Sequence, residues 1–270
     1  MKRTAAVILA CILQAQIAAA APDPKPLRFD DTPIVVLRSS AEEPYLTRLR
    51  ETYKLADVVA GATTDYERVR AVSRWVRTRW NHNGSNTPEK NDPISILEEA
   101  AAGKKFRCVE YAAVLAAALN SIRIPARVLA LATEDVETRE SGAGHVVAEA
   151  WLADRQAWIM VDGQFDVIPL LDGRPLNAVE LQRALAGGAK GLSVASLSET
   201  KAERYFDWVA LYLYFFHTPL DQRYPAPASR TELCLLPVGA KPPTVFQKKW
   251  SFGSNAFTHS VALFYAPPHD

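Results

Sequence analysis

A cysteine, a histidine and an aspartate are the residues of this sequence whose types and spacing could perform covalent chemistry. Cys108 directly precedes an apolar run at 109–119, which predicts that its thiol lies at the start of a buried helix. Free backbone N–H groups and the helix dipole favour a negative charge at that position. Lys104, Lys105 and Arg107 add local positive charge. We therefore expect Cys108 to ionise readily to a nucleophilic thiolate.

His145 and Asp162 lie on two segments, 145–153 and 157–164, whose alternating pattern predicts neighbouring strands joined by a short turn. If opposed residues of this hairpin have an odd number sum, the two side chains share one face, ~5–8 Å apart at Cβ. A carboxylate there can hold one imidazole nitrogen and leave the other for a thiol, as in a nucleophile–base–acid triad. An even sum would place Asp162 on the opposite face.

The elements that must position these groups are predicted to be helices first and strands afterwards. This order indicates an α+β fold. The aromatic residues between Tyr205 and Phe216 could line a substrate groove, but a helix packed on the core explains them more simply. We expect helices at 41–60, 64–80, 92–103, 108–119, 177–187 and 199–216, and strands at 126–135, 145–153, 157–164, 231–237 and 258–265.

Three blocks of the sequence occur in an order that resembles one known family. Together they span about 64–168, and the segment resembles the transglutaminase-like superfamily of papain-like cysteine enzymes. Two departures, Val147 where the family often has Trp and Phe106-Arg107 where it often has Gly, leave the substrate preference open. The resembling residues are Cys108-Val109-Glu110-Tyr111-Ala112, Leu115, Leu119, Ile124-Pro125-Ala126-Arg127-Val128, His145, Glu149, Trp158, Val161 and Asp162.

The resemblance implies a papain-like fold in which the nucleophile begins a buried helix packed on an antiparallel sheet. It also implies that a thiolate attacks an amide or ester carbonyl of a peptide or protein to give a thioacyl enzyme. Cys108 would be the nucleophile, with its backbone N–H in the oxyanion hole, His145 the general base and then acid, and Asp162 the orienting carboxylate. Water would release the acyl group in a hydrolase, and an amine would release it in a cross-linking transferase. Transglutaminases also use an upstream Trp, for which Trp80 and Trp75 are candidates, although both fit a packed core.

Composition excludes several other classes of protein. The chain has 270 residues, of which 49% are hydrophobic and 23% charged, as in an ordinary globular protein. Lys and Arg number 31 against 30 Asp and Glu, so no basic excess predicts a nucleic-acid partner. The sequence has no CxxC, HxxxH or HExxH spacing, and we expect no metal and no cofactor. The other histidines, His82, His217, His259 and His269, are expected to be structural or exposed.

The first 20 residues predict a secretory signal peptide and hence a periplasmic or extracellular protein. A basic start is followed by an apolar run and by small residues that suit a signal peptidase. Gln14 and Gln16 interrupt that run and disfavour a retained membrane span. Cys11 leaves a lipoprotein anchor as an alternative. The remainder divides into an N-terminal segment at 21–63, a catalytic core at 64–170 and an extension at 171–270, which completes the fold or shapes the cleft.

Cys234 differs from Cys108 in its surroundings. It lies in an apolar, strand-like run and is expected to be an inert core thiol. A disulfide between the two cysteines is the alternative that suits an oxidising compartment. Two other functions therefore stay open beside the enzyme: a catalytically silent transglutaminase-like domain used for binding in the cell envelope, and a disulfide-stapled structural protein.

Overall fold

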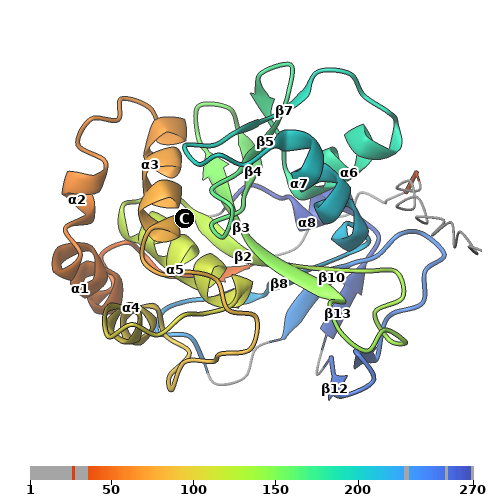
Figure 1. Ribbon diagram of the computed structural model, residues 1–270, viewed down its shortest axis with the longest axis horizontal. Helices are drawn as coiled ribbons and strands as arrows, with labels where there is room; N and C mark the ends of the chain where they lie inside the picture. Colours follow the sequence, from red (N-terminus) through yellow and green to blue (C-terminus); the bar gives the residue numbers. More distant parts are fainter. Residues whose placement is uncertain (1–25, 28–35, 228–230, 253–254, 269–270) are drawn as a thin grey trace, which may run out of the picture.

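A six-stranded sheet lies at the centre of the structure (Figure 1), a computed structural model that describes residues 26–27, 36–227, 231–252 and 255–268. Its strand order is β13-β10-β8-β2-β3-β4. Neighbouring strands are antiparallel except β10 and β13, which are parallel. The strands are β2 (Ala126–Ala132), β3 (Gly144–Leu152), β4 (Ala157–Val161), β8 (Phe215–Pro219), β10 (Glu232–Leu235) and β13 (Asn255–Thr258).

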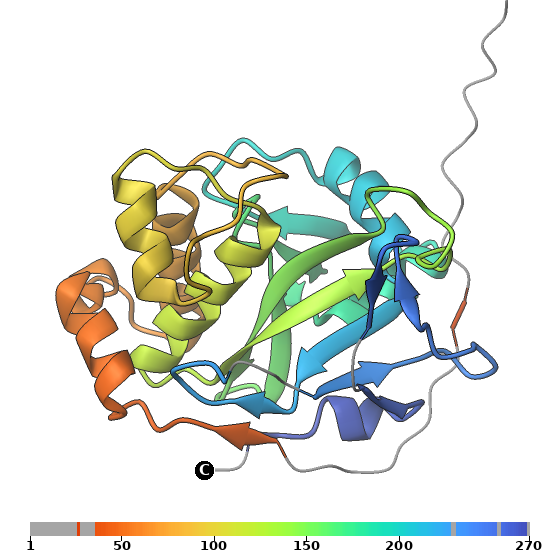
Figure 2. The ribbon, with the colours of Figure 1, turned by 90° about the horizontal axis from the view of Figure 1, so that it is seen from below.

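Among the described residues, five helices lie on one side of this sheet, and α5 makes the most extensive contact with β2 and β3 (Figure 2). Local signals explain where two of them begin. Thr64 and Glu67 form a reciprocal capping box at the start of α3, and the Asp92 side chain accepts the backbone N–H of Ser95 in α4. The five are α1 (Pro44–Thr52), α2 (Leu55–Val58), α3 (Asp65–Arg77), α4 (Pro93–Ala101) and α5 (Cys108–Ser121).

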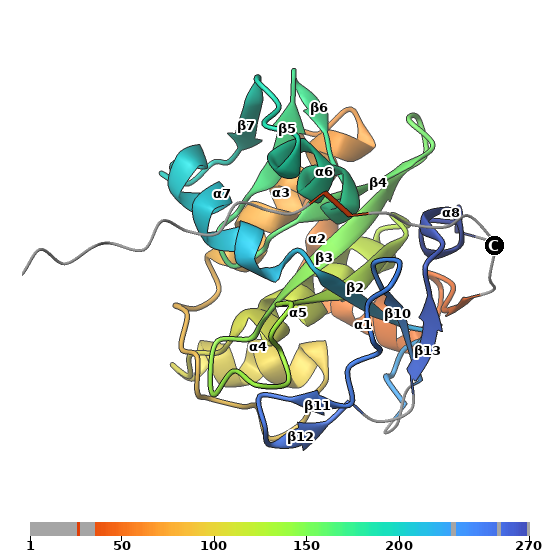
Figure 3. The ribbon, with the colours of Figure 1, turned by 90° about the vertical axis from the view of Figure 1, so that its right-hand side faces the viewer.

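The opposite face is covered by the C-terminal half of the chain. A small three-stranded sheet of order β6-β5-β7 lies beside α6 and α7 (Figure 3). Among the described residues these elements are β5 (Ile168–Leu171), β6 (Arg174–Pro175), α6 (Ala178–Ala186), β7 (Leu192–Ala195), α7 (Ala202–Val209), the 3₁₀ helix η1 (Ala210–Tyr212) and α8 (Val261–Phe264). Two peripheral strand pairs are β1 (Leu37–Arg38) with β9 (Asp221–Gln222), and β11 (Val245–Phe246) with β12 (Trp250–Ser251).

Alternation along the strands separates two hydrophobic cores. Ala148 and Ala150 of β3 pack toward the N-terminal helices, whereas Val147 of the same strand packs with α6, α7 and α8. Met160 of β4 packs in the core that contains α6, α7 and α8, whereas Val161 packs in the core formed with the N-terminal helices. His145 and Asp162 share the alternation of Val147 and Met160. Their side chains are therefore directed toward the C-terminal half of the protein.

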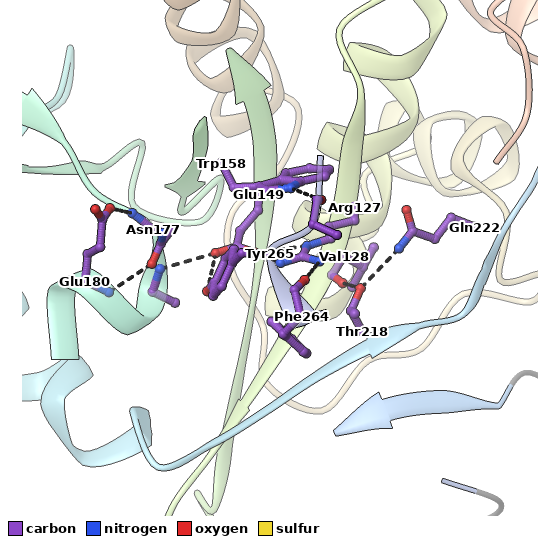
Figure 4. Close-up of polar contacts among 12 residues, drawn as sticks. Arg127, Val128, Glu149, Trp158, Asn177, Glu180, Thr218, Gln222, Phe264 and Tyr265 are labelled. Atoms are coloured by element: carbon purple, nitrogen blue, oxygen red, sulfur yellow. Dashed lines mark hydrogen bonds and ion pairs between the residues drawn. The ribbon is translucent and has the colours of Figure 1, made fainter. Parts of the chain in front are cut away.

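A buried ion pair joins the strands on this same side of the sheet (Figure 4). The Arg127 guanidinium donates to the Glu149 carboxylate at 2.6 and 3.0 Å, and both side chains are almost completely buried. Tyr265 donates its hydroxyl to the other Glu149 oxygen at 2.9 Å, and Arg127 donates to the Phe264 carbonyl at 2.7 Å. Arg127 and Glu149, two of the residues that carry the family resemblance, thus fasten β2, β3 and the C-terminal segment together.

The predicted helix at 199–216 is wrong at its C-terminal end, where residues 213–216 are not helical. Helix α7 ends at Val209 and η1 at Tyr212, and Phe215–Pro219 form β8, which pairs with β2 and β10 in the middle of the sheet. A fully buried strand is apolar on both faces, and its sequence then shows the same continuous apolar run as a buried helix. The predicted strand at 258–265 is also displaced: β13 ends at Thr258 and α8 follows. The predicted helix at 41–60 is two helices, α1 and α2.

The signal peptide and Cys11 lie outside the described residues. Within the ranges that the structure describes, none of the helices is both long enough and apolar enough to cross a lipid bilayer.

Candidate active site

Cys108 is the first residue of α5, as the sequence predicts. The helix begins there because Glu110 accepts the backbone N–H of Arg107 at 3.0 Å and also binds the Arg107 guanidinium. Lys104 is likewise paired, with Glu99 at 2.6 Å. Two of the cations expected to act on the thiol are therefore engaged by carboxylates. The helix N-terminus and His145 can also stabilise a negative charge on Cys108, and the Arg107 guanidinium remains close enough for its charge to act on that thiol.

His145 and Asp162 are in direct contact, and the distance from His145 Nε2 to Asp162 Oδ2 is 2.7 Å. Strands β3 and β4 pair Ala148 with Val161, so opposed residues have the odd number sum that a shared face requires. Both side chains are buried, at 2% and 0% exposure. The expectation that the two residues lie on one face of this hairpin is confirmed.

The Asp162 carboxylate has four donors around it. Oδ1 accepts the backbone N–H groups of Gln164 and Phe165 at 3.0 and 3.2 Å. Oδ2 accepts from His145 and also from the Tyr205 hydroxyl at 2.9 Å. Asp162 is itself fixed by a β-bridge to Val167. A buried carboxylate held in this way has no freedom to rotate away from the imidazole.

The electrostatic surroundings of His145 keep its imidazole protonated. Burial lowers the pKa of His145, but the adjacent Asp162 carboxylate and the Cys108 side chain together raise it to about 9. Because Nε2 is bonded to Asp162, Nδ1 is the ring nitrogen available to the Cys108 thiol, which lies close enough to interact with the imidazole. The structure thus brings Cys108, His145 and Asp162 together from three different elements. A protonated imidazole beside a half-buried thiol can stabilise the thiolate that nucleophilic attack requires.

Aromatic side chains from the C-terminal half surround the imidazole. The Trp208 ring lies 4.7 Å from that of His145 between centroids, in an edge-on arrangement. The ring centroids of Tyr212 and Phe165 lie 6.0 and 6.2 Å from that of His145. These rings exclude water from the His145–Asp162 contact and strengthen it. Part of the aromatic run that the sequence assigned to core packing therefore lines the site.

The two candidate oxyanion tryptophans have different positions. Trp80 is buried, and its ring centroid lies 4.4 Å from that of Tyr111 and 5.9 Å from that of Phe106, which are three residues after and two residues before Cys108. Trp75 is partly buried against the same hydrophobic core, and its ring packs edge-on against Tyr53. Trp80 is thus the one next to the nucleophile, and its burial confirms that it is a core residue.

A second cysteine–histidine contact is present in the sheet, but its chemistry differs. Cys234 Sγ lies 3.3 Å from His217 Nε2, and both residues are almost completely buried. Burial lowers the pKa of His217 to about 4 and raises the pKa of Cys234 above its ordinary value. Both shifts favour the neutral forms of the two side chains, and the burial of Cys234 confirms its position in the core, while its inertness stays a prediction. Cys108 and Cys234 are both free, so the alternative of a disulfide between them is wrong.

Among the described residues, no group of three or more His, Cys, Asp or Glu side chains is arranged to hold a metal ion.

Comparison with known proteins finds a family model that matches part of the chain. Residues 53–163 match the family model described as the transglutaminase-like superfamily. No curated protein sequence matches the chain significantly. Among solved structures, the chain is similar to a proposed cysteine protease from Cytophaga hutchinsonii, at 16% identity and a TM-score of 0.36 over 64% of this chain and 57% of that one. It is also similar to the transglutaminase of red sea bream, at 13% identity and a TM-score of 0.37 over 74% and 38% of the two chains. The match thus spans less than two thirds of either structure's own length.

Proposed function

We propose that this chain, whose residues 53–163 match the transglutaminase-like superfamily, is an exported cysteine enzyme that cleaves or transfers the acyl group of a peptide-like amide. The observation that carries the proposal is the way in which His145 is held. Its Nε2 is bonded to a fully buried Asp162, while the thiol of Cys108 adjoins the same imidazole. This is the arrangement of nucleophile, base and orienting acid that covalent acyl transfer requires.

In the acylation step, the Cys108 thiolate attacks the carbonyl carbon of the amide, and the C–O π electrons move onto oxygen. The backbone N–H of Cys108, at the N-terminus of α5 where intrahelical acceptors are lacking, is placed to stabilise that oxyanion. When the tetrahedral intermediate collapses, the C–N bond breaks and His145 gives its proton to the leaving amine. The product is a thioester between Cys108 and the acyl group.

In deacylation, proton transfer at His145 runs in the opposite direction. His145, now neutral, removes a proton from water or from a second amine, which attacks the thioester carbonyl. The C–S bond breaks and Cys108 leaves as a thiolate beside the reprotonated imidazole. Water as the acceptor gives hydrolysis, and an amine gives a new amide. Asp162 holds the imidazole in one orientation throughout and stabilises its positive charge.

Export is part of the same proposal and rests on residues 1–20, whose basic start, apolar run and small residues are typical of a secretory signal. The expected result is that the mature protein begins after Ala20. N-terminal sequencing of protein recovered from the secreted or periplasmic fraction would show this, and a retained Met1 would contradict it.

The acyl-transfer proposal is tested with p-nitrophenyl acetate, an activated ester that acylates reactive thiols. Peptide mass spectrometry should find the acetyl group on Cys108, and Cys108→Ala should abolish both this adduct and the release of nitrophenol above background. Cys234→Ala is the matched control and should react as the unchanged protein does. Acetylation that is equally fast in Cys108→Ala, or in His145→Ala, would favour the catalytically silent binding domain.

A further inference from the structure

The carboxylate that orients His145 is shared with a residue outside the family match. Oδ2 of Asp162 accepts hydrogen bonds from His145 Nε2 at 2.7 Å and from the Tyr205 hydroxyl at 2.9 Å. Tyr205 lies in α7, 43 residues along the chain from Asp162, and beyond the matched segment 53–163. One oxygen atom is thus fixed between two donors that come from separate parts of the fold.

Because it is buried, the hydrogen bond from Tyr205 to Asp162 cannot be replaced by one from water. Tyr205 is 3% exposed and Asp162 is 0% exposed, so water cannot replace the hydroxyl if it is lost. Burial and the neighbouring carboxylate raise the pKa of Tyr205 well above its ordinary value, so the phenol keeps its proton and remains a donor. Its ring is held by Phe165 at 5.6 Å and by Phe206 at 6.0 Å between centroids, which fixes the direction of the O–H group.

The same helix also reaches the imidazole directly. Trp208 lies three residues after Tyr205, and therefore on the same side of α7, and its ring lies 4.7 Å from His145. Tyr212 of η1 adds a second contact at 6.0 Å. One short segment of the C-terminal half, 205–212, thus contacts both members of the His145–Asp162 pair.

We propose that Tyr205 is a positioning residue of the active site, which acts through Asp162 to set the orientation and charge of the His145 imidazole. This inference rests on the proposed function, because it assigns a role within the same acyl-transfer site. It makes the C-terminal half of the chain part of that site and more than a cover for the sheet. The segment 53–163 alone would lack one of the two donors to Oδ2.

The titratable groups around His145 are those that the test must hold constant. Asp162, directly after β4, and Cys108 of α5 act on the imidazole, and Tyr212 adjoins it from η1. His82, in the loop before α4, is close enough for its charge to act on His145. Tyr205→Phe leaves all of these groups in place and removes a single hydroxyl, so a change in the titration of His145 reports on that hydroxyl.

The experiment follows the imidazole of His145 by ¹H–¹⁵N correlation spectroscopy between pH 6 and 11 in the full-length protein. The resonances are assigned by comparison with His145→Ala. In Tyr205→Phe we expect the midpoint of the titration to rise by roughly half a pH unit. The reason is that the hydroxyl proton no longer shares the carboxylate charge, which then acts more strongly on the imidazolium. In an Asp162→Asn background the imidazole loses its proton more easily, so the titration is followed to lower pH, and Tyr205→Phe should add no further shift.

Tyr265→Phe is the matched control. Tyr265 also donates its hydroxyl at 2.9 Å to a buried carboxylate, but that carboxylate is Glu149 of the Arg127 ion pair (Figure 4). Thermal unfolding should show a comparable loss of stability in the two tyrosine variants, and only Tyr205→Phe should move the titration of His145. An unchanged midpoint in Tyr205→Phe, or an equal shift in Tyr265→Phe, would overturn the proposal.

A measurement on the unchanged protein covers the case in which Tyr205→Phe does not fold. The Tyr205 hydroxyl proton should be protected from solvent exchange and show a nuclear Overhauser effect to the His145 ring proton on Nε2. Fast exchange of that hydroxyl proton would contradict the proposal. The p-nitrophenyl acetate assay distinguishes failure of this proposal from failure of the proposed function. Acylation of Cys108 that does not depend on His145 would refute the proposed function. An unchanged midpoint of the His145 titration in Tyr205→Phe would refute only the role of Tyr205.

Discussion

Asp162→Asn should change how the stability of the protein depends on pH. In the folded protein the pKa of His145 is raised to about 9, against an unperturbed value of 6.5; burial opposes the rise, and the Asp162 carboxylate is its first cause. Because the folded pKa is the higher one, the protonated imidazole stabilises the fold fully below pH 6.5. That stabilisation is lost as the pH rises through 9.

The size of the effect follows from the shift. A difference of one pKa unit corresponds to about 1.4 kcal/mol, so the raised pKa of His145 represents about 3 kcal/mol of stability. His145 is 2% exposed, and screening by solvent is therefore small. In Asp162→Asn only burial and Cys108 still act, and the imidazole should be neutral over most of this range. The variant should therefore be about 3 kcal/mol less stable relative to the unchanged protein at pH 6 than at pH 9.5.

Urea unfolding, followed by tryptophan fluorescence at pH 6, 7, 8, 9 and 9.5, measures the free energy of unfolding of the Asp162→Asn variant and of the unchanged protein. Titrating groups that do not interact with His145 contribute equally to the two curves and cancel in the difference between them. A difference in the free energy of unfolding that stays constant within about 1 kcal/mol from pH 6 to 9.5 would refute the reasoning. It would mean that Asp162 does not hold the charge of His145.

Three further outcomes are expected. Glu149→Gln leaves the Arg127 guanidinium buried without its carboxylate and should lower the free energy of unfolding by about 3–5 kcal/mol in urea at pH 7; a loss below about 1 kcal/mol would contradict the ion pair. Thr64→Ala removes the capping box of α3 and should cost about 1 kcal/mol in the same assay, and no change would show that the cap is unimportant. With Ellman's reagent, Cys108 should react in the native protein and Cys234 only after unfolding, because Cys234 is fully buried and burial raises its pKa; equal native rates would contradict this.

Local signals explain the parts of the fold that the sequence predicted. The Thr64–Glu67 capping box and the Asp92-Pro93 start of α4 involve residues within one helical turn of each other, so tertiary packing does not alter them. The strand Phe215–Pro219 was not predicted, because an apolar run of this length suits either a buried helix or a buried strand. Its conformation is decided by β2 and β10, on which it pairs, and these are distant in the sequence.

In the candidate site, too, the features set by residues nearby in the sequence could be predicted, and those set by distant residues could not. Period-two alternation left the shared face of His145 and Asp162 dependent on the hairpin register, which the pairing of Ala148 with Val161 decides. An apolar run was enough to place Cys108 at a helix start. Their catalytic roles stay predictions. Tyr205 could not be found in this way, because its partner Asp162 is 43 residues away and no spacing rule links a helix residue to that carboxylate. Arg107 was expected to act on the thiol, but its partner Glu110 became apparent only from the structure.

The pH dependence of alkylation at Cys108 tests the central claim most directly. Iodoacetamide labelling between pH 5 and 10, read by peptide mass spectrometry, separates Cys108 from Cys234, and His145→Ala is the comparison. Cys108 should be labelled rapidly at pH 6 in the unchanged protein, and at least about tenfold more slowly in His145→Ala. If the labelling of Cys108 has the pH dependence of an ordinary thiol and the same rate in both proteins, a thiolate–imidazolium pair is contradicted.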